Sequence, residues 1–169
     1  MSLNGFDNAP FWLSSKIFVA TNVLGYVINL FAPHLHYHVD LMGTVAFAVA
    51  AFPSLLSDTS RVQWSSAAVV VWSVKLAGFL FYRVLQSGHD GRLDDILSSP
   101  VYAAGFWTYS ALWGLVCSLP HSLGTTTAAV GNPIAVQAGL VLAGAGILTE
   151  TLADYQKWNF KRTNPSAFC

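Results

Sequence analysis

Residues 134–162 read IAVQAGLVLAGAGILTETLADYQKWNFKR. The apolar part of this stretch, Ala135 to Leu152, approaches the roughly 20 residues that a helix needs to cross a bilayer. Charged residues follow at steps of four, three and four, which places them on one face of a helix: Glu150, Asp154, Lys157 and Lys161. Because ionisable groups are costly to hold in a membrane, this face is a candidate functional site.

The composition predicts the same class for the whole chain. Apolar residues make up 54% of it and charged residues 9%, against roughly 25% charged residues in soluble domains. The mean hydropathy is +0.51. We therefore predict an integral membrane protein in contact with membrane lipids. The net charge is zero and the sequence contains no basic tract, so nucleic acid is not expected as a partner.

Five apolar segments are predicted to form membrane-spanning helices in an all-α, polytopic bundle. They are Phe11 to Phe31, Val39 to Leu56, Trp64 to Leu85, Val101 to Leu119 and Ile134 to Leu152, the last continuing as an amphipathic helix to about Arg162. Pro53 is expected to kink or end the second segment because proline lacks a backbone N–H. No internal repeat or linker is visible, so residues 1–169 are predicted to form one domain.

The distribution of basic residues predicts the orientation. With five spans, one side receives only Arg61 and Lys16, and the other side receives Arg83, Arg92, Lys157, Lys161 and Arg162. The positive-inside bias places the larger group, and with it the C-terminus, on the cytosolic, stromal or matrix side.

The third apolar segment carries a second candidate group. Lys75, Phe79 and Tyr82 follow helical spacing, so an ammonium group and a phenol face the same way. A phenol within a membrane can donate a proton to a carbonyl or enone, and a nearby cation stabilises the negative charge that develops. The structural alternatives are a Lys75 that only pairs with a carboxylate and a Tyr82 that anchors a helix at the membrane interface.

Two other groups are interpreted as structural. Three histidines alternate after the first segment, and we interpret them as part of an interfacial loop and predict no metal site: His34, His36 and His38. Three aspartates are interpreted as a solvated loop and the start of a helix, because aspartate favours first turns: Asp90, Asp94 and Asp95.

Two sequence blocks together resemble a known family. The first block, within Leu76 to Ile96, contains Gly-Phe-Leu-x-Tyr-Arg and Gly-x-Asp-x-Arg-x-Asp-Asp. The second block runs from Glu150 to Lys161 as Glu-Thr-x-Ala-Asp-x-Gln-Lys-x-x-Phe-Lys, and the chain closes with Pro-x-x-Phe-Cys. In combination, and at this separation, the blocks resemble the DUF1295 branch of the steroid 5α-reductase superfamily.

This resemblance implies a membrane reductase that uses NADPH to reduce a carbon–carbon double bond in a lipid or steroid-like substrate. It implies that nucleotide binding falls to Asp154, Lys157 and Lys161. It also implies that Tyr82 engages the carbonyl group of the substrate.

The resemblance and the cost of buried charge give further expectations for the charged residues. Asp40 fits a recurring family pattern, and Lys75 stands where the family commonly has arginine, which argues against a bidentate role for Lys75. We expect Glu150 and Asp154 to face the interior of the bundle, where at least one of them pairs with Lys75 or Arg83.

The family pattern continues beyond the Phe-Cys pair. It adds a Gly-x-Trp turn, an Arg-His-Pro-Asn-Tyr-Phe-Gly-Glu type segment and two more helices that carry most of the nucleotide-binding surface. We therefore expect the 169 residues to be a C-terminally incomplete reductase that binds NADPH weakly or not at all. The alternative is a non-catalytic membrane subunit that packs against other proteins in a larger complex.

Overall fold

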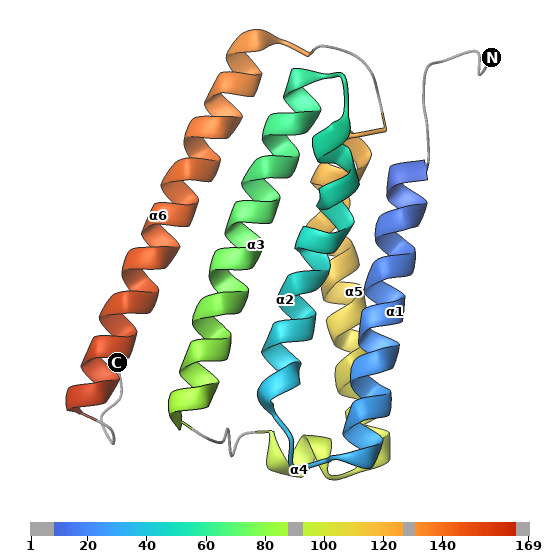
Figure 1. Cartoon of the computed structure of the whole chain (residues 1–169), viewed down its shortest axis with the longest axis vertical. Helices are drawn as coiled ribbons and strands as arrows, with labels where there is room; N and C mark the ends of the chain where they lie inside the picture. Colours follow the sequence, from blue (N-terminus) through green and yellow to red (C-terminus); the bar gives the residue numbers. More distant parts are fainter. Residues whose placement is uncertain (1–8, 88–92, 127–130, 165–169) are drawn as a thin grey trace. The chain divides into compact units, whose positions relative to one another are not determined.

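Figure 1 shows the computed structural model of the protein, which describes residues 9–87, 93–126 and 131–164. All secondary structure in these ranges is helical: α1 (Ala9–Phe31), α2 (Tyr37–Ala51), the 3-10 helix η1 (Phe52–Leu56), α3 (Ser60–Ser87), α4 (Asp94–Leu97), α5 (Pro100–Gly124) and α6 (Pro133–Thr163). The chain divides into two compact units, Met1–Val130 and Gly131–Cys169. We call them unit 1 and unit 2; α6 is the helix of unit 2.

Four helical stretches are long and apolar enough to cross a membrane: Ala9–Phe31, Tyr37–Leu56, Ser60–Gln86 and Pro133–Thr163. The predicted all-α membrane bundle is confirmed, and all five predicted segments coincide with helices. The segment in α5 forms a helix of 25 residues but is not among the four candidate spans, so a fifth span there stays a prediction. The predicted single domain stays a prediction.

The buried face of α1 is built mainly from polar and small residues. These buried residues recur at helical spacing: Ser14, Phe18, Asn22, Gly25 and Asn29. Large apolar residues occupy the opposite face, where Val23 is 55% exposed and Phe31 is 87% exposed. A membrane helix has this arrangement because lipid solvates apolar side chains, while polar groups find partners in the protein.

Close helix packing in unit 1 depends on two glycines. α1 packs against α2 and α5, and α2 also packs against α3. A Cβ atom at Gly25 of α1 would overlap the ring of Trp107 from α5, and a Cβ atom at Gly114 of α5 would overlap the ring of Phe18 from α1. Each glycine therefore admits an aromatic ring from the neighbouring helix, as small residues commonly do at membrane helix interfaces.

A buried serine joins α3 to the backbone of α2. The Ser73 hydroxyl donates to the carbonyl oxygen of Thr44 over 2.6 Å and accepts from the N–H of Ala48 over 3.1 Å. In a regular helix that carbonyl and that N–H bond to each other, so Ser73 bridges one turn of α2. α2 ends three residues later at Ala51, and Pro53 lies in the first turn of η1, which confirms the expected break.

The sequence also fixes the start of α6. Gly131 has φ of 77°, in the left-handed region that glycine tolerates. Asn132 then caps the helix, because its Oδ1 accepts from the N–H of Ile134 over 2.9 Å, and Pro133 occupies the first turn. α6 continues without a break to Thr163, so four of its charged residues share one helical face as predicted: Glu150, Asp154, Lys157 and Lys161.

Candidate functional site

The clearest charged site in unit 1 is an ion pair between α2 and α3. It lies at the end of unit 1 where α1 and α3 finish and α2 and α5 begin, which we call the α4 end (Figure 1). Arg83 Nη2 donates to Asp40 Oδ2 over 3.0 Å, and the two side chains are 34% and 40% exposed. A carboxylate in the first turn of α2 is also favoured by the helix dipole. The structure thus brings together two of the residues singled out from the sequence.

Tyr82 and Lys75 lie on the same helix as Arg83. Tyr82 directly precedes Arg83 on α3 and is 49% exposed, whereas Lys75 is partly buried about two turns earlier. Their separation of seven residues puts the phenol and the ammonium group on one face of α3. Their predicted chemical roles stay predictions.

Two histidines are buried at the α4 end. His36 and His38 are 5% and 8% exposed, and the His38 ring stacks on Trp107 with ring centroids 5.6 Å apart. His36 Nε2 lies 3.6 Å from the carboxylate of Asp94. His34 and His36 lie in the loop before α2, as interpreted from the sequence, whereas His38 lies in the first turn of α2, and the burial of His36 and His38 was not foreseen. His34 alone is exposed.

Buried amides on α1 form a further polar group that the sequence analysis missed. Asn29 Nδ2 donates to the carbonyl oxygen of Leu97 over 2.7 Å, which fastens α4 to α1. Among the described residues, Asn22 Oδ1, Asn29 Oδ1 and Trp107 Nε1 are buried without a hydrogen-bond partner. A signal was present in the sequence, since asparagines seven residues apart in an apolar run share one helical face.

Polar contacts also lie at the opposite end of unit 1, which contains η1. Arg61 Nη1 donates to the carbonyl oxygen of Gly124 over 2.9 Å, and the hydroxyl of Ser65 lies 2.9 Å from His121 Nδ1. A cavity of about 210 Å³ lies nearby and is lined by residues of four helices, among them Ser14, Trp72 and His121. We call this the η1 end. Arg61 and Arg83 therefore lie at opposite ends of unit 1, as the charge distribution predicted.

The predicted nucleotide-binding residues all belong to α6. Asp154, Lys157 and Lys161 lie in its C-terminal half, and Lys161 and Arg162 occupy its last turn. The expected pairing of Glu150 or Asp154 with a basic residue of α3 stays a prediction. Two residues used in the sequence analysis, Asp90 and Arg92, lie outside the described residues.

Comparison with known proteins identifies the family. Residues 25–168 match the family described as "Protein of unknown function (DUF1295)". The chain belongs to the DUF1295 family. The matched region contains Asp40, the Tyr82–Arg83 block and the charged face of α6. No curated protein and no solved structure matches the chain.

Proposed function

We propose that this DUF1295 protein is a membrane oxidoreductase that uses NADPH to reduce a carbon–carbon double bond in a lipid or steroid-like substrate. The observation that carries the proposal is the Asp40–Arg83 ion pair beside Tyr82. Arg83 and Tyr82 are consecutive on α3, so a guanidinium group and a partly exposed phenol lie at one level of the helix, on adjoining faces. This combination suits a substrate whose carbonyl oxygen gains negative charge during reaction.

The residues of α6 fit the chemistry of a dinucleotide phosphate. Lysines at positions 157 and 161 and Arg162 supply positive charge for phosphate oxygens, and the Asp154 carboxylate accepts hydrogen bonds from ribose hydroxyls. Asp154, Lys157 and Lys161 are spaced so that one molecule can contact all three along a single helical face. We assign them to orienting the nucleotide.

In the proposed reaction a hydride and a proton add across the double bond. NADPH supplies the hydride when it is bound and leaves as NADP⁺. Tyr82 donates a hydrogen bond to the substrate carbonyl oxygen, which withdraws electron density from the double bond. Arg83, held by Asp40, favours the negative charge that develops on that oxygen. Lys75 lies on the face of α3 that carries Tyr82 and adds to the positive field there.

The test uses native membranes that contain the protein, with progesterone as the probe enone. We expect NADPH-dependent loss of the enone absorbance. Tyr82→Phe should lower kcat by about 10²-fold or more, the usual contribution of an acid catalyst, with little change in the KM for NADPH. Asp154→Asn and Lys161→Gln should raise the KM for NADPH instead. Tyr102→Phe on α5 is a matched control, expected to leave both constants unchanged.

Turnover that does not respond to any of these substitutions would contradict the proposal. So would the absence of enone reduction across a panel of steroid and isoprenoid enones, and co-purification of the protein with a large membrane complex would then favour the non-catalytic subunit.

The residues 1–169 on their own are proposed to bind NADPH weakly. Three cations near one helix end are screened by salt over about 8–10 Å in water, and exposed ion pairs contribute little to affinity. Calorimetric titration of NADPH into the purified chain should therefore show no micromolar binding. Micromolar binding that disappears with Lys161→Ala would overturn this expectation.

We also propose that the C-terminus lies on the cytosolic, stromal or matrix side, because basic residues gather at the α4 end of α3 and at the end of α6. In sealed vesicles whose interior corresponds to the cytosolic, stromal or matrix side, a cysteine placed at position 164 of a chain with Cys117 and Cys169 replaced by serine should react with a membrane-impermeant maleimide only after the membrane is opened. Labelling in sealed vesicles would contradict this orientation.

A further inference from the structure

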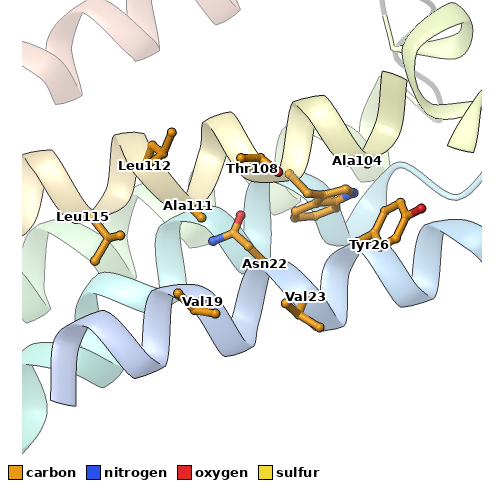
Figure 2. A pocket seen from close by; sticks show the side chains of 10 residues that line it. Val19, Asn22, Val23, Tyr26, Ala104, Thr108, Ala111, Leu112 and Leu115 are labelled. Carbon is orange, nitrogen blue, oxygen red and sulfur yellow. The ribbon is translucent and has the colours of Figure 1, made fainter. Parts of the chain in front are cut away.

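An apolar groove lies between α1 and α5, and no residue of α3 lines it (Figure 2). Its volume is about 430 Å³, within the range of roughly 300–1,000 Å³ that is typical of small-molecule sites. Aliphatic side chains from both helices form most of its wall, including Val19, Val23, Leu112 and Leu115. None of the described side chains that line the groove is charged.

Asn22 places a hydrogen-bond acceptor in this apolar wall. It lies near the middle of α1 and is only 4% exposed. Its Nδ2 donates to the carbonyl oxygen of Phe18 over 2.7 Å, whereas its Oδ1 has no partner among the described residues. In Figure 2 the Asn22 amide points from α1 toward the wall formed by α5. A membrane interior offers no water to satisfy that oxygen, so a ligand with a donor group is favoured there.

Trp107 gives the same groove a hydrogen-bond donor. Its Nε1 is buried without an acceptor among the described residues. The indole ring is held in place because it fills the space above Gly25, stacks on His38 and meets Phe106 edge-on with ring centroids 5.5 Å apart. The mostly apolar lining of the groove therefore includes Asn22 and Trp107, whose Oδ1 and Nε1 have no partner among the described residues, and the hydroxyl-bearing side chains of Tyr26 and Thr108.

We propose that the groove binds a neutral lipid alcohol. The hydroxyl group of such a molecule donates to Asn22 Oδ1 and has lone pairs left to accept from a donor such as Trp107 Nε1, while its hydrocarbon part covers the aliphatic wall. A phosphate or carboxylate headgroup is disfavoured because no lining cation is available to it. An alkyl chain alone leaves the buried amide oxygen unsatisfied. This site is separate from the reduction proposed above and does not depend on it.

The experiment compares farnesol with farnesyl methyl ether on the full chain in phosphatidylcholine nanodiscs. The ether keeps the hydrocarbon and the acceptor oxygen but lacks the hydroxyl donor. We expect saturable binding of farnesol, and binding of the ether that is weaker by about tenfold, the effect of losing one good hydrogen bond. Equal binding of the two probes, or no saturable farnesol binding, would overturn the proposal.

Substitution then locates the site. Asn22→Leu keeps the side-chain size and removes the acceptor, so farnesol affinity should fall about tenfold to the level of the ether, while ether affinity stays the same. Thr21→Val is the matched control on the neighbouring position, since the Thr21 hydroxyl bonds within α1 to the carbonyl of Ile17. Undiminished farnesol binding by folded Asn22→Leu would overturn the assignment to this groove. The comparison of the two probes on the unaltered chain is independent of how any variant folds.

Discussion

The two ends of unit 1 hold their polar side chains in different ways. At the α4 end a carboxylate and a guanidinium group bond to each other across two helices, and buried histidines lie beside them. At the η1 end Arg61 donates to a backbone carbonyl, and the hydroxyl of Ser65 lies 2.9 Å from His121 Nδ1.

Helix geometry accounts for the Arg61 contact, whereas the Asp40–Arg83 pair joins side chains of two helices. The carbonyl of Gly124 lies at the C-terminus of α5, where helix geometry leaves carbonyl groups without partners, so Arg61 completes the fold. Asp40 lies in the first turn of α2, where the helix dipole favours a carboxylate, and Arg83 bonds to it from α3. Because charged groups within a membrane are costly, we proposed above that this pair takes part in the reaction.

The largest expected effect comes from the two glycines at which α1 and α5 pack closely. It tests whether the helices pack equally tightly toward the α4 end and toward the η1 end, although the polar contacts at the two ends differ. Gly25→Ala should clash with Trp107 toward the α4 end, and Gly114→Ala with Phe18 toward the η1 end. Each should lower the free energy of unfolding in detergent by about 1–3 kcal/mol, the usual cost of overpacking. Gly105→Ala, with open space around it, is the control and should be neutral or stabilising. A loss confined to one variant would show that the two halves also differ in packing.

A smaller effect is expected from two buried polar side chains, one at each end. Asn29→Ala removes the bond that fastens α4 to α1 and leaves the Leu97 carbonyl without that donor, so we expect a loss of about 1–2 kcal/mol. Ser122→Ala at the η1 end removes a bond to Ser118 within the same helix, and the loss should stay below about 0.5 kcal/mol. Urea-assisted thermal unfolding measures both. Equal losses would contradict the view that α4 is held by long-range polar contacts.

Much of the fold could be predicted from the sequence, because membrane helices are encoded by local composition. Apolar runs of suitable length, interrupted by proline, glycine and serine, gave helix positions within a few residues of those observed. The break at Pro53 followed from its missing N–H. These signals need no knowledge of the neighbouring helices.

The candidate site was harder to predict because it depends on contacts between distant segments. Asp40 and Arg83 were each singled out, but their pairing joins residues 43 positions apart. His38 is stacked on Trp107, more than sixty residues later, and alternating spacing alone could not reveal this contact. Asn22 was overlooked because the segment around it was judged by its length and its apolar content. The helical spacing of its polar residues, which places them on one face, was not considered.

The next prediction measures the ion pair itself. A double-mutant cycle of Asp40→Asn and Arg83→Gln should give a coupling free energy of about 1 kcal/mol, between the values typical of exposed pairs and of buried charge-assisted bonds. The coupling should decrease when salt is raised from about 0.05 M to about 0.5 M, because both side chains are partly exposed. Coupling near zero at low salt would mean that the pair does not hold Arg83 beside Tyr82.

The smallest effect is expected at the η1 end, from Arg61→Met. The substitution keeps much of the aliphatic side chain and removes the bond to the Gly124 carbonyl. Other hydrogen bonds also stabilise the C-terminus of α5, since the N–H groups of Thr125 and Thr126 donate to carbonyls of the preceding turn. Water at the membrane surface can also replace a donor to Gly124, so the loss in unfolding free energy should be about 0.5 kcal/mol. Enone reduction and farnesol binding should both be unchanged in this variant. A loss of unfolding free energy as large as that of Asn29→Ala would contradict this prediction. A change in enone reduction or in farnesol binding would show that Arg61 does more than bond to the end of α5.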